Sequence, residues 1–296
     1  MPHRNRTEIL KGHAVMLLFS VLVAGSFSLG GIIATMIDPA ALNALRFLIA
    51  SVIIGTLVFA QGGIRREYLQ DPWRYPVMGG LFAIYFVTMF EGLKTSPPVS
   101  SAAMFTLTPV LAAGFGWLLL RQVTTPRMAL ALALAAAGAI WVIFRGDIDA
   151  ILAFDIGRGE VIFFFGVVAH AIYTPMIRKL NRGEPPLVFT FGMLVSGFIL
   201  LSAYGAPAIL QTDWSALPAI VWITLAYLSV FASATTFFLV QYATLRLPSA
   251  KVMAYTYLVP AWVILWEFAL GNGFVQPFVL AGVALVVVAL LMLLKD

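Results

Sequence analysis

Cysteine is absent from the 296-residue chain, and histidine occurs only 3 times. Without thiols, the chain forms no disulfide and has neither a thiol nucleophile nor a cysteine-ligated metal. The HExxH and GxSxG patterns of zinc peptidases and serine hydrolases are missing too, as is a GxxxxGK[ST] phosphate loop. These absences argue against an enzyme and against an ATP-driven motor, and we expect no cofactor and no metal.

Charge is also scarce, at 10% of residues, whereas hydrophobic residues make up 61%. A soluble protein of this length needs more charge to cover its surface. Apolar runs close to the roughly 20 residues that cross a bilayer recur along the whole chain, which predicts an all-α polytopic membrane protein. The ten predicted spans are 13–35, 40–60, 74–94, 97–120, 126–145, 157–179, 187–204, 217–243, 248–269 and 275–294. The longest loops are then 61–73, 145–157 and 205–216, the last with a turn predicted at Ala206-Pro207.

Prolines repeat at one fixed offset, which indicates a duplicated chain. Three of them lie 151 positions before three others, pairing Pro97, Pro109 and Pro126 with Pro248, Pro260 and Pro277. We therefore predict a first five-helix repeat at 1–150 and a second at 151–296. Because five is odd, the second repeat enters the membrane from the opposite side. Such inverted repeats are typical of carriers with a site near the bilayer midplane.

The net charge of +5 is explained by membrane orientation rather than by a nucleic-acid partner. If the N-terminus is cytoplasmic, 14 of the 18 basic residues fall on the cytoplasmic side, as the positive-inside rule requires. These are Arg4, Arg6, Lys11, Arg65, Arg66, Arg74, Arg121, Arg127, Arg178, Lys179, Arg182, Arg246, Lys251 and Lys295. We expect a multi-pass protein of the bacterial inner membrane with both termini in the cytoplasm.

Three stretches of sequence resemble the EamA family of the drug/metabolite transporter superfamily. They are Asp38 to Ala50, Ser100 to Val110 with Leu118 to Arg121, and Ser249 to Pro260. The resemblance implies ten helices in two inverted repeats and export of small solutes. Within the family the chain is most similar to bacterial exporters of aromatic and other amino acids, the YddG type. Ala24, Gln122 and His170 depart from the usual pattern, so no individual solute is carried over.

Pro109 and Pro260 fall in the middle of two predicted spans and should kink both helices. Each proline deprives the carbonyl four residues earlier, at Phe105 and Thr256, of its partner. The two kinks could flank the solute cavity. Alternatively, they shape helix packing, and a nearby Ser or Thr hydroxyl satisfies the carbonyl.

Six residues at midmembrane depth are candidates for solute binding. They are Tyr85, Thr106, Thr108, His170, Tyr257 and Trp262. His170 is the most informative, because an intramembrane histidine suggests a functional site and can titrate near neutral pH. Pocket lining and proton transfer both remain open for it, whereas metal binding lacks a second ligand one turn away. Hydroxyls in membranes also join helices, and aromatic rings also pack, so each of the other five has a structural alternative.

Arg46, Glu91 and Glu267 are further charged residues within the predicted spans. Charges inside a membrane usually pair or face a cavity, so Arg46 could meet Glu91 or Glu267 in an outer gate or coupling site. Alternatively, the three side chains reach the membrane surface.

Taken together, the sequence predicts a secondary transporter that exports amino acids and related small metabolites by alternating access. Its partners would be the small-molecule solute and membrane lipid. A proton-coupled antiporter for drugs or metabolites, with His170 or Glu267 as the relay, is one alternative. A channel or lipid scramblase is another, from a different class.

Overall fold

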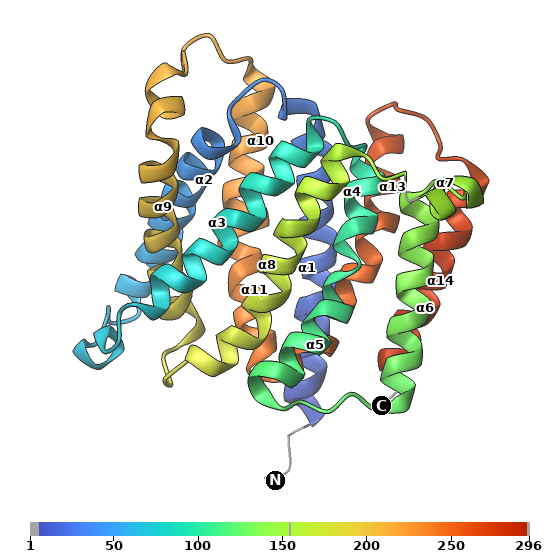
Figure 1. The fold of residues 1–296 in the computed structure, drawn as a ribbon. Helices are drawn as coiled ribbons and strands as arrows, with labels where there is room; N and C mark the ends of the chain where they lie inside the picture. Colours follow the sequence, from blue (N-terminus) through green and yellow to red (C-terminus); the bar gives the residue numbers. More distant parts are fainter. Residues whose placement is uncertain (1–5, 154, 295–296) are drawn as a thin grey trace.

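A computed structural model describes residues 6–153 and 155–294, and within these ranges all regular structure is helical. Among the described residues, nine helices are long and apolar enough to span a membrane, and α14 (Pro277–Leu294) is a shorter apolar helix. The predicted all-α membrane fold with ten transmembrane helices is thus confirmed (Figure 1). Arg4 and Lys295, counted in the charge argument, lie outside the described residues, as do the outer ends of the two predicted repeats.

Five transmembrane segments form the first half of the chain, and five form the second. The first five are α1 (Arg6–Ile33), α2 (Pro39–Ala60), α3 (Arg74–Leu93), α4 with α5 (Pro98–Phe105, Thr108–Leu120) and α6 (Pro126–Ile143). The second five are α8 (Arg158–Leu180), α9 (Pro186–Gln211), α10 with η2 and α11 (Ala219–Ser229, Val230–Thr235, Thr236–Thr244), α12 with η3 and α13 (Ser249–Met253, Ala254–Leu258, Val259–Ala269) and α14. Two short helices, η1 (Arg66–Leu69) and α7 (Ile148–Ala153), occupy loops. The predicted division after residue 150 falls inside α7.

The repeated prolines occupy equivalent places in the two halves. One pair directly precedes α4 and α12, the second lies in the first turn of α5 and α13, and the third begins α6 and α14. Proline suits these positions because the first turn of a helix needs no N–H donor and favours a fixed φ. The spacing seen in the sequence therefore reflects a shared pattern of helix starts.

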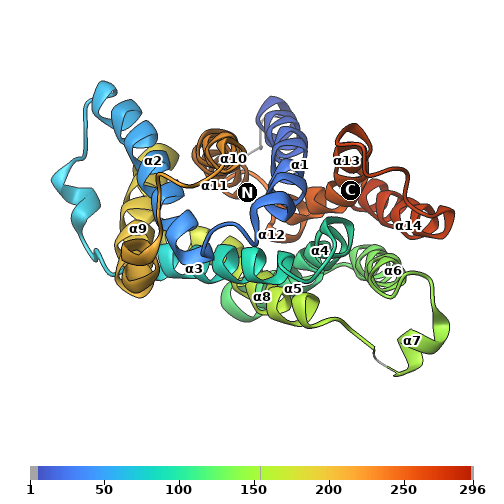
Figure 2. The same ribbon diagram turned by 90° about the horizontal axis from the view of Figure 1, so that it is seen from above.

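Helix contacts follow the inverted symmetry. α2 packs on its counterpart α9, and α6 packs on its counterpart α14. α3 of the first half packs on α8, and its counterpart α11 in the second half packs in the same way on α1, the counterpart of α8. Seen from above, the α2–α9 pair lies at one end of the bundle and α6–α14 at the other (Figure 2). The α6–α14 contact is close at Gly138, where a Cβ atom would lie 2.7 Å from the Gly282 carbonyl oxygen, so only glycine fits.

The predicted loop at 205–216 is partly helical, as are the predicted loops that hold η1 and α7. α9 continues through Pro207 to Gln211, beyond the predicted end at 204, so the turn expected at Ala206-Pro207 was wrong. Pro207 removes only one hydrogen bond, close to the end of the helix. The Thr212 N–H still donates to the Ala208 carbonyl at 3.0 Å, and the Trp214 indole donates to the Ile209 carbonyl at 3.1 Å. These bonds hold the last turn of the helix.

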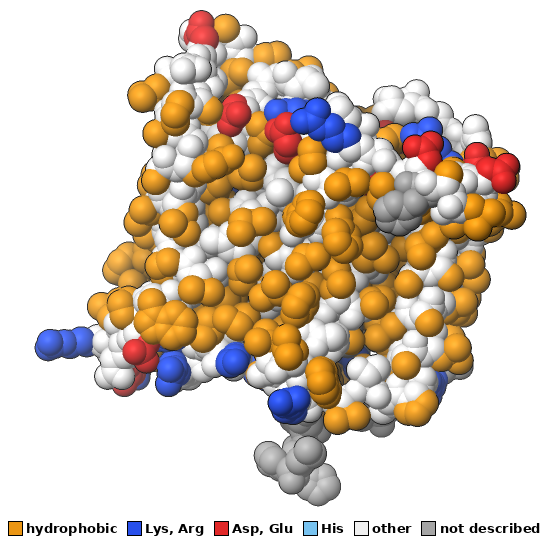
Figure 3. All heavy atoms as spheres, in the orientation of Figure 1, with side chains coloured by type: hydrophobic (Ala, Val, Ile, Leu, Met, Phe, Trp, Pro, Cys, Tyr) orange, Lys and Arg blue, Asp and Glu red, His pale blue; other side chains and the backbone are white. Residues whose placement is uncertain are grey.

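The surface has the pattern of a membrane protein. On the face shown in Figure 3, hydrophobic side chains form a broad band, and most charged side chains lie above and below it. Basic side chains line the lower edge, the side on which both chain ends lie in Figure 1. The orientation predicted from the positive-inside rule agrees with this picture and stays a prediction.

Candidate functional site

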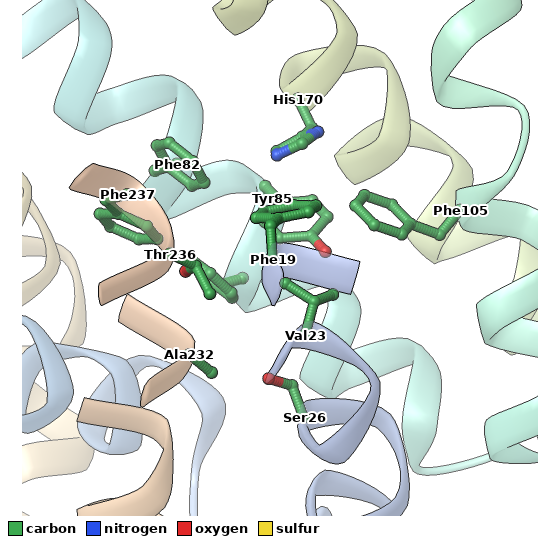
Figure 4. A pocket seen from close by; sticks show the side chains of 11 residues that line it. Phe19, Val23, Ser26, Phe82, Tyr85, Phe105, His170, Ala232, Thr236 and Phe237 are labelled. Atoms are coloured by element: carbon green, nitrogen blue, oxygen red, sulfur yellow. The ribbon is translucent and has the colours of Figure 1, made fainter. Parts of the chain in front are cut away.

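A small cavity lies at the centre of the bundle, between the two repeats (Figure 4). The first repeat lines it with Phe19, Val23, Ser26, Phe82, Tyr85, Phe86 and Phe105. The second repeat lines it with His170, Ala232, Thr236 and Phe237. Its volume of about 10 Å³ holds roughly one water molecule. In this conformation the centre is therefore closed, and a solute can enter only when the walls move apart.

Aromatic rings close the cavity. The Phe82 ring centroid lies 4.1 Å from that of Tyr173 and 4.2 Å from that of Phe237. It also lies 5.4 Å from the His170 ring and 5.6 Å from the Phe86 ring. Offset and edge-to-face contacts of this kind stabilise a packed core. They also give the cavity a wall suited to an apolar or aromatic solute.

Two buried polar atoms on the cavity wall have no hydrogen-bond partner among the described residues. They are Nδ1 of His170 and Oγ of Ser26. A buried polar group without a partner costs about 1–3 kcal/mol, so each such atom requires an explanation. Because both side chains line the cavity, a polar group of a bound solute would satisfy them.

Tyr85 and His170, two of the residues selected from the sequence, lie together on the cavity wall. Their ring centroids are 4.7 Å apart, and the Tyr85 ring also lies 4.6 Å from that of Phe86. Tyr85 is 3% exposed and His170 is 2% exposed. Their role in solute binding stays a prediction, which this placement supports.

Thr106 and Thr108 flank the break between α4 and α5 and are not among the cavity-lining residues. The Thr106 hydroxyl donates to the Ala103 carbonyl at 2.6 Å, and the Thr108 hydroxyl donates to the Phe105 carbonyl at 2.6 Å. The second bond satisfies the carbonyl that Pro109 leaves without an N–H partner. Thr108 thus has the backbone-repairing position foreseen as the alternative to solute binding.

The corresponding region of the second repeat also faces away from the cavity. The 3₁₀ helix η3 precedes Pro260, as the α4–α5 break precedes Pro109. Tyr257 is fully buried in an apolar cluster with residues of α6 and α14, and its hydroxyl has no partner among the described residues. Trp262 donates from its indole to the Ser20 hydroxyl at 3.2 Å, which joins α13 to α1.

The three membrane-embedded charges lie apart from one another in this conformation. Glu91 pairs with Lys94 at 2.6 Å, and Glu267 accepts a hydrogen bond from Asn272 at 2.8 Å. Arg46 is fully buried and bonds to neutral groups. An outer gate formed by Arg46 with Glu91 or Glu267 is therefore not assembled in this state.

Comparison with known proteins identifies the family to which this chain belongs. The model of the EamA-like transporter family matches residues 10–144 and 157–295. The chain belongs to this family. It is therefore a multi-pass membrane transporter of small solutes with inverted-repeat topology, and the names of its relatives indicate a transporter rather than an enzyme.

Two curated relatives align over most of their length. The uncharacterized transporter YyaM of Bacillus subtilis is 27% identical over 281 residues, covering 94% of this chain and 92% of the relative. An uncharacterized transporter of Archaeoglobus fulgidus is 24% identical, covering 87% and 88%. A solved crystal structure at 20% identity superposes with a TM-score of 0.71, covering 97% of this chain and 96% of the other. That likeness concerns the fold alone.

Proposed function

We propose that this EamA-like transporter exports aromatic and apolar amino acids across the bacterial inner membrane by alternating access. Family membership gives a membrane transporter of small solutes. The proposal adds the solute class, the direction and the mechanism. The direction rests on the resemblance to amino-acid exporters of the YddG type.

The central cavity is the observation that carries the proposal. Its wall is mostly aromatic, and it also presents two polar atoms without partners, Nδ1 of His170 and Oγ of Ser26. An amino acid with an apolar side chain matches both features: the side chain packs on the rings, and the ammonium group donates to the free acceptors. Both repeats contribute to the wall, so rocking one repeat against the other would open the site to either side.

Contacts at the basic end of the bundle would have to break when the cavity opens there. Arg246 pairs with Glu8 at 2.8 Å, and its guanidinium lies 3.5 Å from the centre of the Tyr242 ring. The His13 ring and the Tyr255 hydroxyl form a hydrogen bond of 2.9 Å. The Arg246–Glu8 and His13–Tyr255 contacts join α1 to the second repeat. An ion pair that is partly exposed to solvent, such as Arg246–Glu8, is weak, which suits a gate that opens repeatedly.

Transport by purified protein in proteoliposomes tests the proposal. We expect saturable uptake of labelled phenylalanine and leucine, accelerated by unlabelled amino acid on the far side of the membrane. Polyamines and nucleosides in the same panel should give no uptake. Flux that never saturates would indicate a channel or scramblase instead, and flux that requires a pH gradient would indicate a proton-coupled antiporter.

The His170→Ala variant is expected to raise KM for phenylalanine by about 5- to 10-fold, because one hydrogen bond to the solute contributes about 1 kcal/mol. Tyr257→Phe is the matched control, since it removes another buried polar atom without a partner among the described residues, but away from the cavity. Initial uptake rates over a range of concentrations give both KM values. Unchanged KM in His170→Ala, or an equal rise in Tyr257→Phe, would remove His170 from the solute site.

A further inference from the structure

Arg46 is a buried cation without a carboxylate partner among the described residues. Its side chain is fully buried in α2. Nε donates to the Ser233 hydroxyl at 2.5 Å, and Nη2 donates to the Ala232 carbonyl at 2.7 Å. Nη1 donates to the Asn43 side-chain oxygen at 3.4 Å. All three acceptors are neutral. A lone positive charge inside a membrane is costly and marks a functional site more often than a structural one.

The guanidinium lies directly behind the cavity wall. Two residues that line the cavity, Phe86 and Ala232, also contact Arg46. The guanidinium carbon lies 3.7 Å from the centre of the Phe86 ring. Ala232 belongs to the π-helix η2, a rare irregularity that is frequent at functional sites. A shift of the Phe86 ring or of η2 would therefore expose the guanidinium to the cavity.

Arg46 retains donors for a ligand. A guanidinium has five N–H groups, and three donate to protein groups in the described chain. The bond to Asn43, at 3.4 Å, is longer than an ordinary N–H···O bond and is easily exchanged. The remaining N–H groups lie in the plane of a rigid fork, whose geometry matches the two oxygens of a carboxylate.

We propose that Arg46 binds the carboxylate of the transported solute, which makes the preferred ligand a monocarboxylate with an apolar or aromatic body. This inference rests on the proposed function, and it adds a cationic partner for the solute carboxylate, which the residues of the cavity wall do not provide. The aromatic wall holds the side chain, and His170 with Ser26 receives the ammonium group. The negative charge of the carboxylate offsets the positive charge of the buried guanidinium, so the buried charge is neutralised only when solute is bound.

Binding to the purified protein tests this assignment with three probes that share a phenyl ring. L-phenylalanine and 3-phenylpropionate carry a carboxylate, whereas L-phenylalaninamide does not. By titration calorimetry, the wild-type protein should bind the two carboxylates at least about 10-fold more tightly than the amide. Arg46→Gln should weaken carboxylate binding roughly 10- to 100-fold, the range for a lost charged hydrogen bond, and leave amide binding within about 3-fold. Arg46→Lys should fall in between, because it keeps the charge without the fork.

Equal weakening for carboxylates and amide would show that Arg46 only ties α2 to η2, and it would overturn the inference. Failure of both carboxylates to bind the wild-type protein would overturn it as well. If Arg46→Gln does not fold, Arg46→Lys tests the same point: it should weaken carboxylate binding and leave amide binding within about 3-fold. Carboxylate binding as tight as in the wild-type protein would contradict the inference.

The proposed function is judged separately, by flux. Phenylalanine transport without Arg46-dependent carboxylate selectivity would refute the inference and keep the amino-acid transporter. Arg46-dependent binding of 3-phenylpropionate without flux of any amino acid would support the inference and refute the amino-acid transporter.

Discussion

Replacement of Ala232 by tryptophan is expected to lower solute flux at least about 100-fold, because the indole would fill the space that the solute must occupy. Ala232 and Ser26 point toward each other across one part of the cavity (Figure 4). The cavity holds only about 10 Å³, so the closed centre cannot absorb a larger side chain. Overpacking by extra methylene groups costs about 1–3 kcal/mol and an indole is larger than that, so flux has to be compared per amount of folded protein.

Phe231→Trp is the matched control for this prediction. Phe231 is the neighbouring residue of the same π-helix, and at 46% exposed it faces away from the cavity. Uptake into proteoliposomes, normalised to folded protein measured by size-exclusion chromatography, should remain close to wild type for Phe231→Trp. Substantial flux in a well-folded Ala232→Trp variant would show that solute does not pass through this cavity.

The Glu184→Gln variant is expected to lose about 3–5 kcal/mol of unfolding free energy, because it leaves a buried guanidinium without its counter-charge. Glu184 pairs with Arg74 at 2.6 Å, and both side chains are fully buried. Arg74 also donates to the backbone carbonyls of Leu180, Gln70 and Asp71, at 2.6, 2.9 and 3.1 Å. The pair ties α3 of the first repeat to the segment before α9 of the second.

The Glu91→Gln variant controls for loss of a carboxylate as such. Glu91 pairs with Lys94 at the same 2.6 Å, but its side chain is 41% exposed, so we expect a loss of only about 0.2–0.5 kcal/mol. Unfolding by denaturant in detergent micelles compares the two variants. Replacing both members of the buried pair, in Arg74→Met with Glu184→Leu, should recover most of the loss. Similar losses for Glu184→Gln and Glu91→Gln would contradict the account of this pair.

The membrane fold could be predicted from the sequence because its signals are local. A span needs only a long enough apolar run, and the repeated prolines mark helix starts wherever the helices end up in space. The wrong turn at Ala206-Pro207 illustrates the limit. Pro207 was taken to end α9, but a proline close to a helix end removes a single hydrogen bond, and the helix continues to Gln211.

The cavity could be predicted only in part. Tyr85 and His170 were found because polar groups are rare in the middle of apolar helices. The phenylalanines of the wall were missed, because Phe occurs 23 times in the chain and helix rotation decides which rings face the centre. Thr108 and Tyr257 lie close to the two helix-start prolines Pro109 and Pro260, but they face neighbouring backbone or the α6–α14 pair instead of the cavity.

The surroundings of Arg46 had no sequence signal. The π-helix η2 has no local signature in the sequence, so the carbonyl that Ala232 offers to Arg46 could not be foreseen. The expected partners Glu91 and Glu267 were chosen for their charge. In the structure each of them is engaged by a neighbour close in sequence.

The central claim is that one internal site between two inverted repeats opens alternately to the two sides of the membrane. The native chain has no cysteine, so Val23→Cys places a single thiol on the cavity wall. Its reaction with a membrane-impermeant maleimide, measured in right-side-out and in inside-out vesicles, tests the claim directly. We predict labelling from both sides, slowed in both cases by transported amino acid. Labelling from one side only, or labelling that the solute never slows, would contradict it.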